Sequence, residues 1–489
     1  MTLLLLAPIL ALLTAAALTA VAGWRGITAW VTAAGALSIL CCGVTLGVQL
    51  GRAPHVLAGG LLRADALSVV MLIVIGTVGT LCAVASIGYV NAELHHSHTD
   101  AAGARLYGTL TPAFLAAMVV TVSANNIGVI WVAIEATTVI TAFLVGHRRT
   151  RTALEATWKY VIICSVGIAM AFLGTILLYF AAGHAGAATG HALDLDVLIA
   201  HASGLDPGVT RLAGGLLLIG YGAKVGLAPF HTWLADAHSQ APAPVSALMS
   251  GVLLSVAFSV LLRLKPIIDT AVGTGFLRWG LLIVGLATAG VAAMLLTVAT
   301  DIKRMLAYSS MENMGLIAIA AAAGTQLAIA ALLLHVLAHG IGKTVLFLAS
   351  GQLQAAHGST AIADITAVFR RSRLVGTSFA VGMLVLLGFP PFAMFASELS
   401  IARALTDARL AWALGVVLVL IAVAFAALVR NSGHLLLGEP ATGSPPVGMP
   451  VTVAAALLVG VAGCFALGVT AGPLTEVLRT AATQLGATP

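Results

Sequence analysis

Apolar segments of about 20 residues recur along the whole chain and alternate with short polar connections. A helix of that length rises about 30 Å, which matches the hydrocarbon core of a bilayer, whereas strands of a membrane barrel are shorter and alternate. The pattern predicts an all-α polytopic membrane protein. We expect fourteen spans, at residues 3–22, 28–50, 64–90, 106–124, 126–146, 156–182, 210–230, 242–263, 276–299, 302–323, 326–353, 375–403, 410–431 and 449–470.

The pattern breaks at two similar places, GLAPF at 226–230 and GFPPF at 388–392. Upstream of each break, residues 126–133 likewise resemble residues 313–320. The two members of each similar pair lie five spans apart. Because successive spans cross the membrane in opposite directions, an odd separation means that the second copy is inverted in the membrane. Inverted repeats with broken helices are a transporter architecture. We predict N-terminal helices 1–3 at 1–105, inverted five-helix units at 106–263 and 276–431, and helix 14 with a short tail at 449–489.

Two arginine triplets fall on one side of this topology, in the loops at 148–151 and 370–373. Cytoplasmic loops carry an excess of Lys and Arg. An even number of spans places both termini on one side, so we expect both termini outside.

Composition agrees with this class, because 60% of residues are hydrophobic and 8% charged, against about 25% charged in soluble proteins. The five cysteines all lie in apolar spans without a CxxC pair, and nothing resembles a dinucleotide or P-loop motif. We therefore expect no cofactor, cluster or metal. The net charge of +6, mostly arginine at loop ends, suits a membrane protein and gives no reason to expect nucleic acid.

Ionisable residues deep in apolar spans carry the functional prediction. A lysine at the centre of a span costs about 2.5–3.5 kcal/mol, and such residues mark ion pathways. Lys224 precedes the first break, and a pairing with Glu135 would lower the cost of both charges. His335, His339 and Lys343 are spaced four residues apart, which places all three on one face of a helix in an arrangement suited to proton hopping. The predicted proton path is Glu135, Lys224, His335, His339, Lys343 and Glu398.

Structural interpretations compete with each of these. A lone membrane histidine such as His335 often only bonds two helices, and a buried Glu–Lys pair can be purely structural. Lys159 forms an i,i+4 pair with Glu155, which is either a surface pair or a modulating charge facing Glu135. His231, which follows the first break, and Ser255, in the span at 242–263, are further possible modulators. We interpret His95, His96 and His98 as a solvated loop, and Tyr308, Ser309, Ser310 and Glu312 as capping and packing residues.

Several long motifs resemble one family, the antiporter-like membrane subunits of respiratory complex I, cation/proton antiporter complexes and membrane-bound NiFe hydrogenases. Segments 124–146 and 154–168 look most like the hydrogenase-4 component F branch. The other motifs are GAKVGLAPFHTWLADAHSQAPAPVSALMSG (222–251), TDIKRMLAYSSMENMG (300–315), HVLAHGIGKTVLFLASG (335–351) and GFPPFAMFASE (388–398).

The resemblance implies proton translocation in a prokaryotic plasma membrane. It implies neighbouring membrane subunits and a peripheral NiFe hydrogenase or dehydrogenase arm, which would hold the redox centres. By motif position, Glu135 matches the helix-five glutamate, Lys224 the helix-seven lysine and Glu398 the helix-twelve carboxylate. The helix-eleven relay matches His335, His339 and Lys343.

One departure concerns helix eight, where M-type complex I subunits carry a lysine and this chain has Ser255. The bridge between the halves would then run through water, Ser255, Ser259 or His335. We expect a proton-translocating subunit of a hydrogenase-4-like or NADH-quinone oxidoreductase-like complex. A sodium/proton antiporter subunit and a non-conducting scaffold remain as alternatives.

Overall fold

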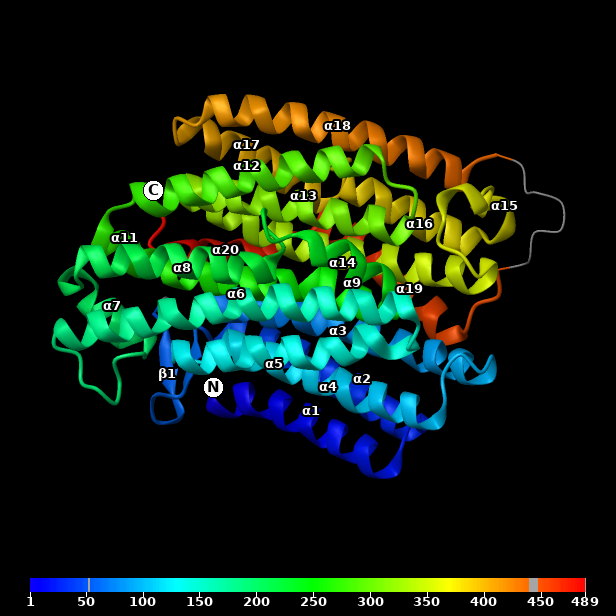
Figure 1. Ribbon diagram of the computed structural model, residues 1–489, viewed down its shortest axis with the longest axis horizontal. Coiled ribbons are helices and arrows are strands. Elements are labelled where there is room, and N and C mark those ends of the chain that lie inside the picture. The colour runs from blue at the N-terminus through cyan, green and yellow to red at the C-terminus, as the bar shows by residue number, and fades with distance from the viewer. Residues whose placement is uncertain (52, 439–446, 489) are drawn as a thin grey trace.

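Long helices lie side by side along one axis of the molecule (Figure 1). The computed structural model describes residues 1–51, 53–438 and 447–488. The first half comprises α1 Thr2–Ala22, α2 Gly26–Gln49, the hairpin of β1 His55–Leu57 and β2 Leu62–Ala64, α3 Ala66–His95, α4 Ala101–Ser123, α5 Ile127–Val145, α6 Arg151–His184, α7 Leu195–His201, α8 Pro207–Val225, α9 Thr232–Gln240, α10 Ala243–Leu248, the π-helical turn η4 Met249–Leu253 and α11 Leu254–Val272. The second half comprises α12 Gly275–Thr297, α13 Ile302–Ala323, α14 Gln326–His357, α15 Val368–Arg371, α16 Arg373–Leu386, α17 Ala393–Asp407, α18 Ala411–Leu436, α19 Val451–Val469 and α20 Gly472–Gln484.

The predicted spans fall on these helices. Eleven helices of the described chain are long and apolar enough to cross a membrane. The three other predicted spans coincide with α8, with α13 and with the α16–α17 pair. α8 and α13 carry several polar or charged groups, and the break divides the third span into α16 and α17, each too short to cross a membrane by itself. The all-α membrane fold is confirmed, while the number fourteen stays a prediction.

Both predicted breaks exist and share one backbone solution. α8 ends at Gly226 and α16 ends just before Gly388, with φ of +81° and +63°. Other residues avoid this left-handed region. In each case the amide of the residue that follows the glycine bonds back into the helix, Leu227 N–H to the Gly222 carbonyl (2.9 Å) and Phe389 N–H to the Leu384 carbonyl (3.0 Å). The freed backbone groups are thus satisfied by protein, as a break at membrane depth requires.

α14 runs through the middle of the bundle and packs against α13, α16, α17 and α19. Almost all of its apolar window is buried. The π-helical turn η4 approaches it closely, because a Cβ on Gly251 would lie 3.0 Å from the Gly340 carbonyl oxygen. π-helical turns inside helices often mark functional sites. The helix that carries three predicted site residues is therefore held on all sides.

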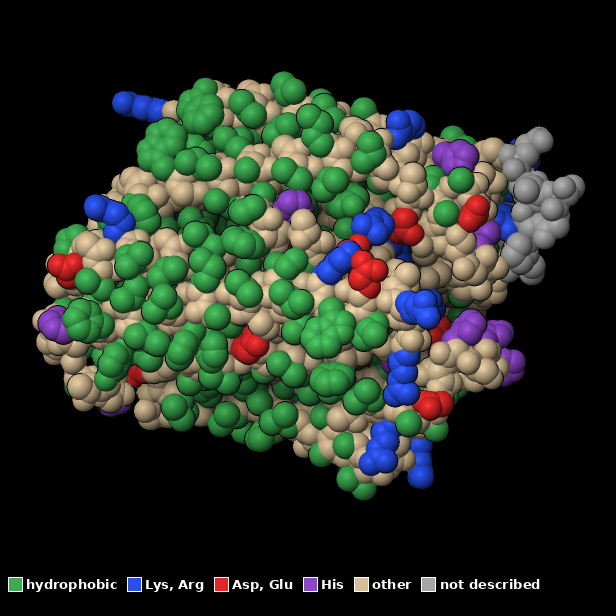
Figure 2. Space-filling model, viewed as in Figure 1, with side chains coloured by type: hydrophobic (Ala, Val, Ile, Leu, Met, Phe, Trp, Pro, Cys, Tyr) green, Lys and Arg blue, Asp and Glu red, His purple; other side chains and the backbone are tan. Residues whose placement is uncertain are grey.

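The two ends of the bundle differ in charge. Both termini lie toward the left-hand end in Figure 1, as an even number of spans predicts. Most Lys and Arg side chains on the visible face gather toward the right-hand end (Figure 2). The turn before α6 and the segment around α15, which hold the arginine triplets, lie at that end. The cytoplasmic position of this end stays a prediction.

The two similar segments at 126–133 and 313–320 occupy less similar positions in the structure than their sequences suggest. Asn126 is the N-cap of α5, and its Oδ1 accepts from Gly128 N–H at 2.9 Å. Asn313 instead lies well inside α13 and bonds to another helix. The two asparagines therefore occupy different positions in their helices. The prediction of an inverted repeat rests on the two breaks.

Candidate functional site

Lys224 lies at the end of α8, fully buried. Its Nζ donates to Thr138 Oγ1 of α5 at 2.9 Å and to the Tyr160 hydroxyl of α6 at 2.5 Å. The Tyr160 hydroxyl in turn lies 2.6 Å from Thr141 Oγ1. Hydroxyls both donate and accept hydrogen bonds. The buried ammonium is therefore solvated by a small hydroxyl network from two neighbouring helices.

The expected pairing of Glu135 with Lys224 is corrected by this geometry. Both residues are described, and no ion pair joins them. Thr138, one turn further along α5, takes the place beside the ammonium, while Glu135 Oε2 is buried without a partner. The two groups still interact electrostatically through space. Glu135 therefore acts on Lys224 only electrostatically, and it does not accept a hydrogen bond from the Lys224 ammonium.

His335 lies on α14 between two helices. Its Nε2 faces Asn313 Oδ1 of α13 at 2.8 Å, and its Nδ1 faces Ser397 Oγ of α17 at 3.0 Å. The Asn313 amide nitrogen donates to the Ser309 carbonyl at 2.6 Å, so its oxygen accepts and His335 Nε2 carries a proton. Which proton state Nδ1 adopts is set by Ser397.

The single hydroxyl proton of Ser397 has two acceptors within reach. Its Oγ lies 2.7 Å from the Met394 carbonyl and 3.0 Å from His335 Nδ1. When the proton points to Nδ1, the imidazole is neutral. When it points to the carbonyl, Nδ1 can carry a proton and donate to Oγ. One hydroxyl rotation therefore fits both charge states of His335 without moving a helix.

Lys343 is fully buried two turns further along α14. Its Nζ donates to the Leu306 carbonyl at 2.7 Å and to the Ser309 hydroxyl, both on α13. A series of hydrogen bonds therefore leads from Lys343 to the Ser309 hydroxyl, and from the Ser309 backbone carbonyl through Asn313 to His335, with the Ser309 backbone joining the two parts. This series passes along α13.

The predicted ladder along the α14 stripe is only partly formed. The rings of His335 and His339 stack with centroids 6.5 Å apart and planes 9° apart, beyond hydrogen-bond reach. Both nitrogens of His339 are buried without a protein partner. The residues share one stripe, as helical spacing requires, but His335 and Lys343 are connected through Asn313 and through the side chain and backbone of Ser309, on the neighbouring helix.

Glu398 lies on α17 just after the second break and is half-buried. Its carboxylate rests against Gly388, where a Cβ would lie 2.3 Å from Oε2. The preceding residue, Ser397, is the partner of His335. Glu398 therefore packs against the second break and follows in sequence the serine that faces His335.

The possible modulators have more modest positions. Lys159 pairs with Glu155 (2.6 Å) and with Asp236 (3.0 Å) on an exposed face, so it is tied to the bundle end and not to Glu135. His231 precedes α9, and its Nδ1 has no partner in the described chain. Ser255 Oγ is also buried without a partner, and it bonds to neither Lys224 nor His335. A direct bridge between the halves is therefore not formed.

Sequence reasoning missed several members of this site. Glu312 was expected to cap and pack, yet its charge acts on both Lys343 and Glu398. A carboxylate inside a predicted span was the available signal. Asn313, Ser397 and Tyr160 gave no such signal, since polar uncharged residues are common in membrane helices.

Broken helices and inward-facing charges define a class of membrane protein, one that moves an ion through the interior of a helical bundle. Residues 124–425 match the family described as NADH:quinone oxidoreductase/Mrp antiporter, transmembrane. The chain belongs to this family of antiporter-like membrane subunits.

Individual relatives place it more closely. A hydrogenase-4 component F homolog from Methylacidiphilum infernorum is 36% identical over 395 residues, which cover 80% of this chain and 82% of the relative. Hydrogenase-4 component B from Escherichia coli is 28% identical over 373 residues, and the match spans 73% of this chain and about half, 53%, of that longer protein. A subunit of an archaeal membrane-bound sulfane sulfur reductase superposes with a TM-score of 0.88 at 23% identity, covering 99% of this chain and 97% of that one, which shows a shared fold.

Proposed function

We propose that the chain moves protons through the membrane along Lys224, His335, Lys343 and Glu398, as a subunit of a hydrogenase-4-like or NADH-quinone oxidoreductase-like complex. One observation carries the proposal. The two lysines of this path, Lys224 and Lys343, are fully buried, and each is held by hydroxyls or carbonyls and not by a carboxylate ion pair. A lysine without a fixed counter-charge can release its proton and leave no orphaned anion behind.

The first half acts as the loading site. Lys224 holds a proton in the Thr138–Tyr160 network while the nearby Glu135 charge favours the ammonium. A change in the partner subunits that moves or neutralises Glu135 removes this attraction. The proton then leaves Lys224. Ser255 lies in the stretch between the halves without a partner, so the transfer there goes through water.

The second half acts as the relay and exit. His335 accepts a proton at Nδ1 as the Ser397 hydroxyl turns to the Met394 carbonyl. Glu398, beside Ser397, then takes the proton to the exit. Lys343 remains connected to the relay through Ser309 and Asn313, so its charge state biases His335.

Electron transfer belongs to partner subunits in this proposal. Two of the relatives are a hydrogenase-4 component F homolog and hydrogenase-4 component B, which supports a peripheral hydrogenase or dehydrogenase arm and further membrane subunits. The arginine-rich bundle end supports a cytoplasmic position for that end and outer positions for both termini. The host membrane is then the plasma membrane of a prokaryote.

The test is Lys224→Met in the intact complex, reconstituted in liposomes. The variant removes the loading site, so proton translocation per electron is expected to fall to background while electron transfer and assembly persist. Lys159→Met is the matched control, because that lysine lies on the exposed face. Full proton translocation in the Lys224 variant would refute the proposal.

A cation/proton antiporter subunit is the second candidate, since the family description also names the Mrp antiporter. This candidate requires sodium movement, so ²²Na uptake driven by a pH gradient separates the two. A scaffold role makes a third outcome: Glu135→Gln and Glu398→Gln would then leave both ion fluxes and assembly unchanged.

A further inference from the structure

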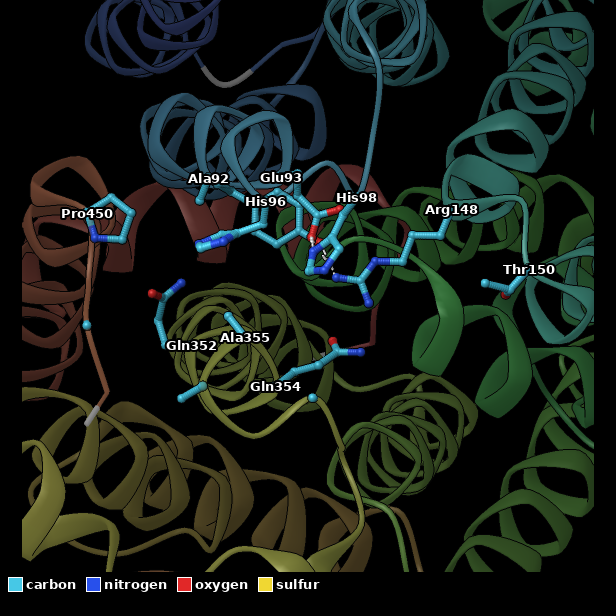
Figure 3. Close-up of a pocket in the computed structure, with 14 residues that line it drawn as sticks. Ala92, Glu93, His96, His98, Arg148, Thr150, Gln352, Gln354, Ala355 and Pro450 are labelled. Atoms are coloured by element: carbon cyan, nitrogen blue, oxygen red, sulfur yellow. Dashed lines mark hydrogen bonds and ion pairs between the residues drawn. The ribbon is translucent and has the colours of Figure 1, made fainter. Parts of the chain in front are cut away.

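A pocket of about 830 Å³, lined in part by charged and amide side chains, opens at the arginine-rich end of the bundle. Its walls come from the ends of α3 and α14, the turn before α6 and the start of α19 (Figure 3). Glu93, His96, His98, Arg148, Gln352 and Gln354 line it. None of these residues belongs to the path described above.

Glu93 is the acidic group of this pocket and is only 5% exposed. Its Oε1 pairs with Arg148 at 2.7 Å and lies 3.8 Å from His98 Nδ1, and the three side chains converge in Figure 3. Its Oε2 is buried with no partner. An acceptor left without a donor is costly when buried, and a proton on Oε2 removes that deficit. Arg148 is itself held by the Tyr89 hydroxyl at 3.2 Å.

Two further buried groups lead inward from Glu93. Lys303 of α13 is 1% exposed, and its Nζ donates to the Ala241 carbonyl at the end of α9 at 2.5 Å. It interacts electrostatically with Glu93 and with Arg148. Lys303 therefore stands between the pocket and α9.

His238 of α9 is the next group and is fully buried. Its Nδ1 donates to the Leu234 carbonyl at 2.7 Å, so Nε2 is the free acceptor, and Nε2 has no partner. The charges that act on this ring are those of Lys303 and Lys343. His238 thus lies within electrostatic reach of both the inward group of the pocket and the relay lysine.

We propose that this pocket is the cytoplasmic proton-uptake site of the chain, with Glu93 as first acceptor and His238 as the carrier toward Lys343. The proposal rests on the proposed proton translocation and supplies a cytoplasmic proton source for its second half, which holds Lys343, while Lys224 remains the loading site of the first half. Glu93 Oε2 takes a proton from hydronium and releases water. The Glu93 carboxyl then gives this proton to the neutral amine of Lys303 and returns to the carboxylate. The Lys303 ammonium gives a proton to His238 Nε2, and the resulting imidazolium gives one to the neutral amine of Lys343, so that each donor returns to its starting state and charge and protons balance at each step.

A purely structural interpretation makes a different prediction. If Glu93 only fastens α3 to the turn before α6 through Arg148, its loss weakens the fold and leaves proton flux per electron unchanged. Glutamine keeps the size of Glu93 and an acceptor for Arg148 but cannot take up a proton. Glu93→Gln therefore separates the two interpretations.

The experiment uses the intact complex in liposomes, with proton translocation per electron measured across a range of external pH. A positioned proton acceptor contributes about 10²–10⁴-fold, so Glu93→Gln is expected to lower proton uptake at least about tenfold. Glu155→Gln is the control, because that exposed carboxylate lies at the same end and outside the pocket. Glu93→Asp is expected to restore part of the flux.

The outcomes are distinct. Wild-type proton translocation in Glu93→Gln, with Lys224→Met at background, overturns this inference and leaves the proposed function standing. Full translocation in both variants overturns the proposed function itself. If Glu93→Gln fails to assemble, Glu93→Asp and His238→Gln decide: a lowered ratio in either supports the uptake site, and wild-type ratios in both overturn it.

Discussion

Gly388→Ala tests whether the second break positions Glu398 for proton transfer. An alanine Cβ at this position would lie 2.3 Å from Glu398 Oε2, while ordinary contact begins at 3.4 Å. The carboxylate must therefore withdraw by about 1 Å, and a displacement of about 1 Å at a reacting group can cost about 10²-fold in rate. The left-handed φ of +63° adds about 1–2 kcal/mol of backbone cost.

Gly324→Ala is the matched control for the backbone term. This glycine ends α13 with a similar φ of +69°, and the nearest atom to its Cβ lies at an ordinary 3.7 Å. Both variants should lose comparable stability in a thermal unfolding assay of the purified complex. Only Gly388→Ala should lose proton translocation per electron in liposomes. Equal translocation in the two variants would show that the exact place of the Glu398 carboxylate is unimportant, and the argument for the exit would fail.

Two further predictions concern groups held between helices. Asp65→Asn removes the charge that binds Arg63 at 2.7 Å and Arg263 at 2.5 Å, so the free energy of unfolding should fall by about 3–5 kcal/mol, measured by denaturant titration; an unchanged midpoint would contradict the buried-pair argument. Asn313→Leu leaves His335 Nε2–H without its acceptor, at a cost of about 1–3 kcal/mol, and should slow proton translocation while electron transfer persists; wild-type pumping would exclude Asn313 from the relay.

The control for the asparagine variant is Asn431→Leu. Asn431 of α18 is also buried, and its amide nitrogen lies 3.6 Å from Met305 Sδ, outside the proposed proton path. Its replacement changes polarity and volume in the same way. Proton translocation should be unaffected.

The membrane fold and several residues of the candidate site could be predicted from the length of the apolar segments and from the free-energy cost of burying a charge in a membrane. Segment length and apolarity predicted the helices, because only helices or closed barrels satisfy the backbone inside a bilayer. Lys224, His335, Lys343 and Glu398 were predicted as site residues because an ionisable side chain is unfavourable inside a membrane span. The structure places all four in or beside buried polar groups. The two helix breaks lie at the GLAPF and GFPPF motifs, as the sequence predicts.

Partners across helices could not be predicted in the same way. Spacing showed that His335, His339 and Lys343 share a stripe, yet it could not show that Ser309 and Asn313 of another helix connect two of them. The similar strings at Asn126 and Asn313 suggested equivalence, and the helix boundaries show that the two residues differ in position. Local similarity does not record where a helix begins.

The sequence by itself determined which segments enter the membrane, where two helices break and which residues are too costly to be there without a reason. The tertiary structure alone decided what each charge touches. Lys224 meets the hydroxyls of Thr138 and Tyr160 and not Glu135, because contacts between helices depend on how the helices rotate and approach one another. Glu93 and His238, far apart in the chain, likewise come within electrostatic range of the same buried lysine, Lys303, only after folding.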